Sequence, residues 1–417
     1  MCLFSLLEAQ WPFHVLQQYF NLSQPGCLRC ARRRFHSCCH RNVRLCHIDT
    51  RSGEVSIHDL LDHTTVSHQA SFHWDIFDSA LKFHAAVVHE CIYCVIPKLD
   101  EGWGLDIAMW QFSSVTGQWL RKADSTQVPS LAAVAVIENL IFYCGGFDMH
   151  SEDRQATSTL LAFDTLSDQW LQLPDMQRDR VGHAVAVKGG RLYITGGRPQ
   201  LVHHTNLEYS VTWSSVEVWD ATVSSWLPCP CQDVERANHS ATFLGDRLFV
   251  VGGSGVVGLE PEFVYHESVE VLSNNARLVE GWVAAGSLAE GREEHTTLVS
   301  KSGNLVVVGG TSDYGHVFAF WDIEVYESSS DTWTTILPTQ LRRVCAFYSC
   351  IGDVLYISGG REFLEDDDWA ATHPSRHTAA CTSYQLTDRS LANVLDLSDT
   401  INPQHMCVTR FWRMSAE

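Results

Sequence analysis

The chain has 417 residues, of which 45% are hydrophobic and 19% charged, so it is long enough to bury a large core. Its net charge of −20 argues against a nucleic-acid partner, because an acidic body repels phosphate backbones. No apolar run reaches the roughly 20 residues that span a bilayer, and Met1 to Leu7 is too short for a secretory signal. We therefore expect a protein of the cytoplasm, or also of the nucleus, with no membrane contact and with its 15 cysteines mostly reduced.

Residues 1–42 differ from the rest of the chain, because they are basic and rich in cysteine. Cys27 and Cys30 are spaced as in many zinc sites. A zinc site needs four converging ligands, however, and the adjacent Cys38 and Cys39 fit that geometry poorly. We predict an irregular, disordered leader over residues 1–42 that binds no metal.

The first predicted strands follow this leader. The segment from Val43 to Asp59 (VRLCHIDTRSGEVSIHD) has the pattern of the third and fourth strands of a four-stranded unit. The segment from His84 (HAAVVHECIYCVIP) is typical of a hairpin. Cys91 and Cys94 fall within this hairpin and not before a helix, so we interpret them as strand residues and not as a redox motif.

Two features then recur in steps of 50 to 57 residues: a Gly-Gly pair after an apolar run, and a tryptophan. The pairs begin at Gly145, Gly196, Gly252, Gly309 and Gly359, and the tryptophans are Trp119, Trp170, Trp226, Trp282 and Trp333. From tryptophan to the next Gly-Gly the distance is 26 or 27 residues, whereas from Gly-Gly to tryptophan it varies from 24 to 30. One half of the repeat is therefore constant in length and the other absorbs insertions.

Each repeat predicts four antiparallel strands. The constant half is clearest from His183 to Gly197 (HAVAVKGGRLYITGG), where two β-rich runs flank a glycine turn. The variable half adds an alternating strand, a polar turn and a tryptophan strand, as from Ser215 to Trp226 (SVEVWDATVSSW). Four strands repeated at about 50 residues are typical of a propeller blade.

Apolar strands ending in Gly-Gly, a variable stretch, a V-E-V strand and a tryptophan strand together resemble the kelch repeat, over about residues 80–400. The resemblance implies an all-β, kelch-type β-propeller. We predict that residues 43–412 form seven blades and that residues 413–417 are a tail. One blade is composite, because the segment from Val43 pairs with a strand near His405 to Met414 and so removes exposed edges. Six blades are the alternative.

Blade geometry assigns the insertions to one face. The loop between the second and third strands emerges at the same end of a blade as the link to the next blade. The insertions after Gly-Gly cover residues 147–158, 198–213, 254–266, 311–321 and 361–378. Because function concentrates on variable loops carried by a rigid scaffold, this long-loop face is the predicted binding surface.

A basic residue recurs on the same face, three positions before the first strand begins its apolar run. It occurs as Arg180, Arg236, Arg292 and Arg343. Guanidinium groups around the central mouth favour carboxylates or phosphates, so we predict that these four residues bind a protein or peptide partner of acidic character. The alternative is that the arginines, together with His183, His239 and His295, only bond loop carbonyls and neighbouring blades.

Catalysis is a further alternative, because some kelch propellers are copper oxidases or sialic-acid epimerases acting at the central mouth. The 21 histidines are scattered, and Glu235, Glu293, Glu294 and His183 are acid–base candidates by position alone. The acidic run at 362–368 lacks the glycine-punctuated spacing of a calcium loop. We predict no catalytic residue, no metal and no cofactor.

The resemblance implies protein recognition as the function. In the kelch family the region before the propeller often carries a ubiquitin-ligase adaptor module, either a BTB domain or an F-box. Residues 1–42 are too few for a BTB domain and show no F-box pattern. A role as a substrate-recognition adaptor, bound to a ligase scaffold, therefore rests on the family alone.

Overall fold

The computed structural model describes the chain from Val43 to Arg413 with gaps. The described residues are 43–49, 55–59, 65–68, 84–89, 91–99, 105–125, 128–147, 155–200, 211–257, 262–273, 281–312, 320, 322–336, 343–344, 346–358, 361–363, 375–377, 381–395 and 407–413. The predicted leader at 1–42 and residues 414–417 of the predicted tail lie outside them. No helix in the described part is long and apolar enough to cross a membrane.

The described residues contain seven four-stranded antiparallel sheets, here called blades 1 to 7 and given from the inner strand to the outer one. Blade 1 holds β33 (Cys407–Arg413), β1 (Val43–Asp49), β2 (Val55–Asp59) and β3 (Thr65–His68). Blade 2 holds β4 (His84–Val88), β5 (Cys91–Leu99), β6 (Leu105–Ser113) and β7 (Gln118–Asp124). Blade 3 holds β8 (Ala133–Ile137), β9 (Leu140–Cys144), β10 (Leu160–Asp164) and β11 (Gln169–Gln172).

The remaining blades follow in chain order. Blade 4 holds β12 (Ala184–Lys188), β13 (Arg191–Thr195), β14 (Val216–Asp220) and β15 (Ser225–Leu227). Blade 5 holds β16 (Ser240–Leu244), β17 (Arg247–Val251), β20 (Val269–Ser273) and β21 (Val283–Ala284). Blade 6 holds β22 (Thr296–Val299), β23 (Leu305–Val308), β24 (Ile323–Glu327) and β25 (Thr332–Ile336). Blade 7 holds β27 (Phe347–Ile351), β28 (Val354–Ser358), β31 (Cys381–Gln385) and β32 (Leu391–Leu395).

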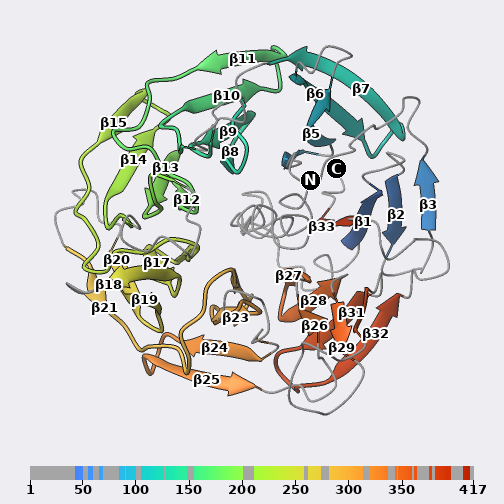
Figure 1. Ribbon diagram of the computed structural model, residues 1–417. Coiled ribbons are helices and arrows are strands. Elements are labelled where there is room, and N and C mark those ends of the chain that lie inside the picture. The colour runs from blue at the N-terminus through green and yellow to red at the C-terminus, as the bar shows by residue number, and fades with distance from the viewer. Residues whose placement is uncertain are drawn as a thin grey trace, which may run out of the picture.

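The blades stand around a central axis, with first strands innermost and fourth strands at the rim (Figure 1). Blade 1 closes the ring, because β1 pairs with β33 from Val43 opposite Arg413 to Asp49 opposite Cys407. The predicted β-propeller is therefore confirmed, with seven sheets and the composite closing sheet that removes two free edges.

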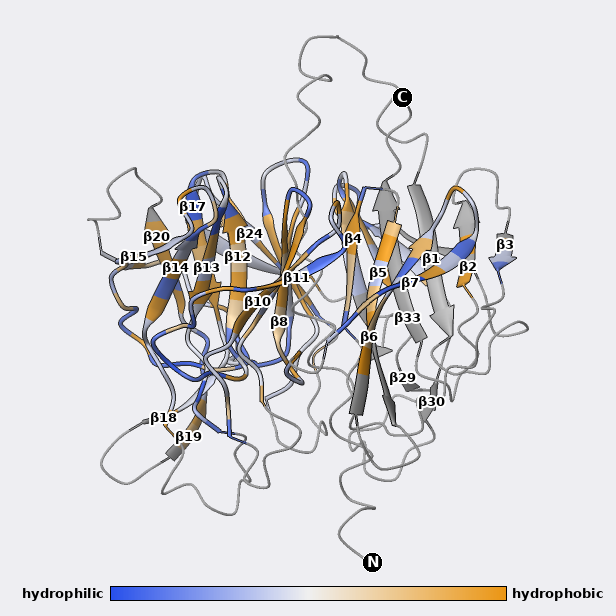
Figure 2. Cartoon of the chain, turned by 90° about the horizontal axis from the view of Figure 1, so that it is seen from above, coloured by the Kyte–Doolittle hydropathy of each residue, from blue (hydrophilic) through white to orange (hydrophobic). Residues whose placement is uncertain are grey.

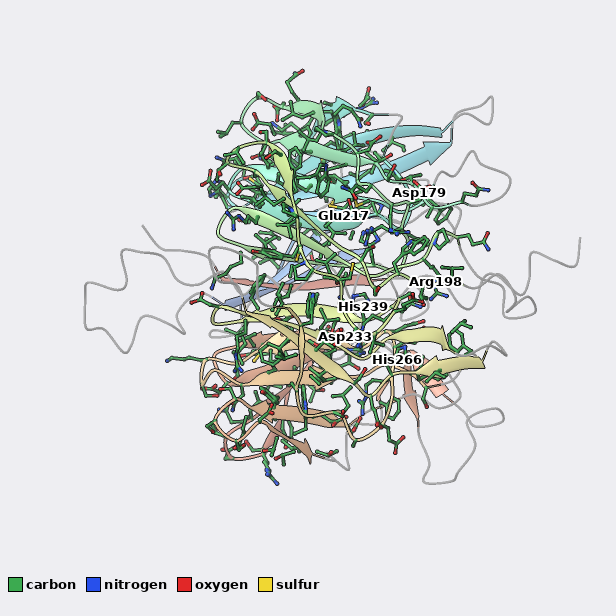
Figure 3. All side chains as sticks on the ribbon, turned by 90° about the vertical axis from the view of Figure 1, so that its left-hand side faces the viewer. Asp179, Arg198, Glu217, Asp233, His239 and His266 are labelled. Carbon is green, nitrogen blue, oxygen red and sulfur yellow. The ribbon has the colours of Figure 1, made fainter. Side chains whose placement is uncertain are left out.

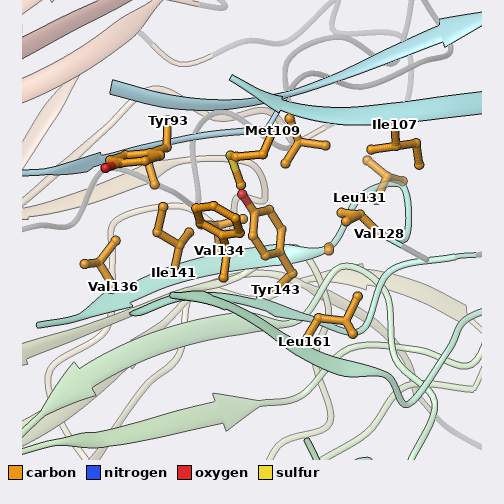
Figure 4. Close-up of a cluster of buried hydrophobic side chains, with 14 of the residues drawn as sticks. Tyr93, Ile107, Met109, Val128, Leu131, Val134, Val136, Ile141, Tyr143 and Leu161 are labelled. Atoms are coloured by element: carbon orange, nitrogen blue, oxygen red, sulfur yellow. The ribbon is translucent and has the colours of Figure 1, made fainter. Parts of the chain in front are cut away.

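The hydrophobic core lies between adjacent sheets. One buried cluster joins blades 2 and 3 and includes Tyr93, Met109, Val134 and Tyr143 (Figure 4). Similar clusters join each pair of neighbouring blades from blade 3 to blade 7. Because successive strand residues point to opposite faces of a sheet, and both faces meet a neighbour, the strands are near-continuous apolar runs.

The Gly-Gly pairs occupy the places where one blade touches the next. At Gly196, φ is +61°, and a Cβ would overlap the carbonyl oxygen of Arg236 and lie 2.6 Å from the ring of His239 on the following blade. The N–H of Gly197 donates to that same carbonyl oxygen at 2.8 Å. Only glycine fits this backbone conformation and this contact together. The same approach recurs at Gly145 and Gly252.

The recurring tryptophans connect neighbouring blades at the rim of the ring. Trp226, Trp282 and Trp333 each donate the indole N–H to a backbone carbonyl that follows the fourth strand of the preceding blade. The acceptors are Pro174 at 3.0 Å, Pro230 at 2.9 Å and Gly286 at 2.6 Å. Tryptophan thus supplies both apolar area and a fixed hydrogen bond at each blade boundary.

The insertions and the links between blades share one face. Backbone bridges join Val181 to Arg198, Ala237 to Ser254 and Glu293 to Thr311, each pairing a link residue with the start of an insertion. In blade 5 the insertion forms a ribbon of β18 (Ser254–Val257) and β19 (Glu262–Tyr265), which lies below the sheets in Figure 2. Near blade 7, β26 (Arg343–Val344), β29 (Arg361–Phe363) and β30 (Ser375–His377) form a second small sheet.

We predict that Gly196→Ala lowers the free energy of unfolding much more than Gly245→Ala. The two glycines have φ of +61° and +59°, but a Cβ at Gly245 meets nothing within 4 Å. The left-handed conformation alone costs about 1 kcal/mol for alanine, whereas overlap with the next blade adds about 2 kcal/mol or more. Urea unfolding of both variants measures the difference. Equal losses would contradict a role of the Gly-Gly pair in blade contact.

Candidate functional site

The arginines at 180, 236 and 292 lie on the links that lead into blades 4, 5 and 6. Their exposed fraction is 0%. Each side chain runs beneath the long-loop face to the third strand of the blade that follows, where it meets a glutamate. The links therefore carry these arginines inside the molecule.

Arg236 shows the arrangement in full. Its Nη1 donates to the carbonyl oxygens of Gly252 at 2.6 Å and Ser268 at 3.1 Å, and its Nη2 donates to Ser268 Oγ at 3.1 Å and Glu270 Oε2 at 2.6 Å. Arg180 repeats these four bonds in blade 4 with Gly196, Ser215 and Glu217. Burial lowers the pKa of both arginines, and the paired glutamate opposes that shift.

Arg292 keeps the pattern with one replacement. Asp322 stands where blades 4 and 5 have serine, and its two oxygens accept from the guanidinium at 2.8 and 3.0 Å. Glu324 accepts from Nη2 at 2.7 Å, and the ring centroid of Phe320 lies 3.9 Å from the guanidinium carbon. Two carboxylates against one guanidinium give this buried cluster a formal charge of −1.

The third-strand glutamates are the residues that our sequence analysis did not assign. Glu217 and Glu270 also accept the backbone N–H groups of Gln177 and Asp233, each at 2.6 Å, and so hold the links in place. Their signal is present in the sequence, because the E of V-E-V recurs in phase with the arginine. Blade 3 lacks this arginine and has Leu161 at the glutamate position.

Our sequence analysis expected these arginines at the surface of the mouth. The structure places Arg180, Arg236 and Arg292 inside the blades instead. Arg180, Arg236 and Arg292 instead bond loop carbonyls and strand residues, which is the alternative stated there. The physical reason is the glutamate, which neutralises each guanidinium inside its blade. Arg343 lies in β26, where its backbone pairs with Glu362, and its side chain lies outside the described residues. Contact of the four arginines with a partner stays a prediction.

The links between blades expose mainly carboxylate side chains to solvent. Among the described residues of the links at 173–183, 228–239 and 285–295, the exposed charged side chains are Asp175, Arg178, Asp179, Asp233, Glu235 and Glu290. Five acidic groups thus stand against one basic group. This described part of the mouth is acidic, which is opposite in sign to the basic mouth that the arginines predicted.

An aromatic residue precedes the third strand in each of these blades. Trp213, His266 and Phe320 each donate the backbone N–H to the second glycine of the Gly-Gly pair, at 2.8 to 2.9 Å. Trp213 is half-buried, its indole N–H donates to the carbonyl of Asp179 at 3.1 Å, and Arg178 stacks 4.3 Å from its ring centroid. Figure 3 shows that Asp179 and His266 lie toward the side from which the β18–β19 ribbon projects.

The three histidines that begin the first strands are buried. His239 Nε2 lies 2.8 Å from Thr195 Oγ1, and His295 Nε2 lies 2.9 Å from Ser240 Oγ. Burial, followed by the charge of the nearby arginine, lowers the pKa of His183 and of His295 to about 3. These histidines are therefore neutral at physiological pH.

Ser240 and His295 have the spacing of a nucleophile and its general base. A histidine with a pKa of about 3 is a poor proton acceptor near neutral pH, so the pair does not activate the serine. Glu293 is also buried, and its Oε2 accepts from Asn238 Nδ2 at 2.9 Å and Ser254 Oγ at 2.5 Å. Of the acid–base candidates, His183 and Glu293 are thus buried, whereas Glu235 is exposed on its link.

The other motif predictions have simple outcomes. Cys91 and Cys94 lie in β5, opposite Ser113 and Trp110 of β6, and are strand residues as predicted. Within the described ranges, no group of three His, Cys, Asp or Glu residues is placed to hold a metal ion. The cysteines of the leader lie outside the described residues.

Comparison with known proteins links this geometry to one repeat family. A family model described as the KLHDC2/KLHL20/DRC7 Kelch-repeats domain matches residues 131–360. Kelch-like protein 26 of Danio rerio is 26% identical over 257 residues, which cover 61% of this chain and 38% of that protein. Kelch domain-containing protein 3 of Rattus norvegicus is 25% identical over 317 residues, which cover 70% of this chain and 76% of that protein. A solved structure titled "Structure of YjhT" covers 71% of this chain and 95% of its own, with a TM-score of 0.49 and 14% identity.

We predict that Arg236→Ala lowers the free energy of unfolding by about 3–5 kcal/mol, because it leaves Glu270 buried without its cation. Arg121→Ala is the control, since the exposed pair of Arg121 with Asp124 contributes about 1 kcal/mol or less. Replacing both partners, as Arg236→Met with Glu270→Leu, imitates the apolar Leu161 of blade 3. Urea unfolding should show that this double variant loses less than Arg236→Ala. A double variant that loses as much or more would contradict the paired-charge account.

We predict that stability falls as the pH drops from about 7 to 5, partly through His183. Its pKa is about 3 in the folded protein and 6.5 without burial, so protons bind the unfolded chain first. The contribution of neutral His183 to the free energy of unfolding is complete above pH 6.5 and is reduced by about 2 kcal/mol at pH 5. His183→Ala should therefore be less stable at pH 7 but lose about 2 kcal/mol less between the two pH values. The exposed His89→Ala is the control, and an unchanged loss in His183→Ala would refute the assignment.

Proposed function

The chain belongs to the kelch-repeat domain family, and from this premise we propose that it binds a partner protein through its long-loop face. The observation that carries the proposal is the difference between the two faces of the ring. The described insertions, among them the β18–β19 ribbon, are bridged to the links on one face, whereas the opposite face has short turns such as Gly189–Gly190. Recognition sites are commonly built from variable loops on a rigid scaffold.

The rigidity of the links supports this proposal. Glu217, Glu270 and Glu324 accept backbone N–H bonds from the three links between blades 3 and 6 while they bind the buried arginines. A surface that is fixed before binding loses little conformational entropy when a partner docks. The family also supports protein recognition, because the relatives reported above are kelch-like and kelch domain-containing proteins.

We infer a protein partner, and we do not propose that it is acidic. The arginines that suggested an acidic partner are neutralised within the blades, and the described links expose mainly carboxylates. We propose recognition in preference to catalysis, and the low pKa of His295, about 3, makes the Ser240–His295 pair a poor nucleophile–base pair.

We further propose that the bound partner is a substrate of a ubiquitin ligase in the cytoplasm, with this chain as the recognition adaptor. The support is the resemblance to the kelch family, whose members often combine such a propeller with an adaptor module. This chain spans 38% of the length of Kelch-like protein 26, so what that whole protein does comes to this chain only as a proposal.

The test is affinity capture from cell lysate with the full chain. We expect a partner that the wild type retains and that is lost when residues 256–263 of the β18–β19 ribbon are replaced by a Gly-Ser linker. The control is Leu166→Ser with Val223→Ser, which changes two exposed aliphatic residues in turns on the opposite face. Equal recovery by the ribbon variant and the control would refute the long-loop face. Recovery of partners without any ligase scaffold would refute the adaptor role.

A further inference from the structure

We propose that the partner contact is centred where blades 4 and 5 meet on the long-loop face, and that this junction binds a lysine-bearing segment of the partner. The inference rests on the proposed function and adds the chemistry of what is recognised. The junction comprises residues 212–214 of blade 4, the link residues 231–236, Ser254 and Gly255 of β18, and His266.

Charge is the first argument. Asp233 and Glu235 are exposed on this link, and Asp179 is exposed on the neighbouring link. The charge beneath them is cancelled, because Arg236 is 0% exposed and is paired with Glu270 at 2.6 Å. The carboxylates therefore act on a ligand without competition from that arginine, and they attract a cation.

Unpartnered polar groups are the second, independent argument. The Oγ1 of Thr212 and both amide atoms of Gln232 have no hydrogen-bond partner among the described residues, although the two side chains are only 4% exposed. Buried polar groups almost always have partners, and exceptions are expected where a ligand completes them. Such groups mark the junction as a place built to receive hydrogen bonds.

Comparison with the neighbouring blades strengthens this argument. Gln232 donates its backbone N–H to Ser214, the bond that Met176 and Leu288 make at the same point of the adjacent links. Met176 and Leu288 both belong to hydrophobic clusters. The fold thus accepts an apolar residue at this position, and the junction of blades 4 and 5 carries a polar one instead.

Three polar atoms gather beside Gly255. An ideal Cβ on Gly255 would lie 3.2 Å from Thr212 Oγ1, 3.0 Å from His266 Nε2 and 2.7 Å from the carbonyl oxygen of Glu235. His266 is neutral at physiological pH, since burial lowers its pKa to about 4, so its Nε2 can accept a hydrogen bond. The Thr212 hydroxyl, the His266 imidazole nitrogen and the Glu235 carbonyl oxygen therefore lie close together beside Gly255, and each of these atoms can accept a hydrogen bond from an ammonium group.

Trp213 supplies a platform beside this cradle. Its backbone N–H donates to Gly197, its carbonyl accepts from the backbone N–H of Arg236, and its indole donates to Asp179. The ring is therefore fixed and partly exposed, and the guanidinium of Arg178, 4.3 Å from its centroid, shows that it attracts a cation. Aromatic rings that are held in this way attract cationic side chains and often dominate binding at interfaces.

The test uses the full chain and two fluorescent decapeptides of alternating glycine with either lysine or glutamate, followed by anisotropy. Asp179→Asn, Asp233→Asn and Glu235→Gln together should weaken binding of the lysine peptide about tenfold or more. The control is Glu138→Gln, Asp246→Asn and Glu327→Gln, which removes the same charge from exposed sites on the opposite face. The control triple should change binding less than about twofold. Equal weakening by both triples, or equal binding of the glutamate peptide, would overturn the proposal.

The unpartnered hydroxyl has its own test. Thr212→Val keeps the shape and removes the Oγ1, so it should weaken lysine-peptide binding about threefold or more, whereas the exposed Thr116→Val should have no effect. Urea unfolding of each variant verifies that it folds. Unchanged affinity in folded Thr212→Val would overturn the site and leave only diffuse attraction. If lysate capture survives the acidic triple but not the ribbon replacement, this inference fails while the proposed function stands.

Discussion

The contact on which this propeller depends is the approach of a glycine backbone in one blade to a carbonyl oxygen in the next. At Gly196 and Gly197 the chain turns with positive φ, one glycine leaves room for Arg236 and His239, and the other donates to the Arg236 carbonyl. This contact places each link at a fixed height above the sheets. The positions of the buried arginine, the aromatic platform and the exposed carboxylates all follow from it.

The buried arginines turn a basic sequence motif into an acidic surface. Each guanidinium is out of solvent, so its charge is balanced where it lies, by Glu217 or Glu270 or by the pair Asp322 and Glu324. Removing ions from water is costly, and such pairs are better understood as fixing one geometry than as adding net stability. The charged side chains that the described links expose to solvent are carboxylates and one arginine.

The sequence predicts the fold well because its main signals are geometric. Glycine pairs and tryptophans at a constant distance report on strand length, and strand length determines the blade and its composite closure. The site is predicted less well, because a repeat-phased Arg236 has the same pattern whether it faces a partner or Glu270. Burial decides between these, and burial depends on a residue about 34 positions away on another strand, a contact that the arginine motif alone does not specify. The V-E-V glutamate could have resolved the question, since a charged residue in phase within an apolar strand requires a buried counter-ion. The polar anomaly at Gln232 is also visible in sequence only after the blades are superimposed.

The pairing of β1 with β33 has a consequence for how this protein is made. Of the described strands, β1, β2 and β3 are synthesised first, and β33, the inner neighbour of β1, is synthesised last. Until then an open ring of blades carries an unpaired edge at β1, and such edges associate with other chains. A message cut short by a few codons before Cys407 would yield a chain with nearly every blade complete and no means of closing. A chain without β33 would therefore keep six complete four-stranded sheets but leave the inner edge of β1 open to other chains.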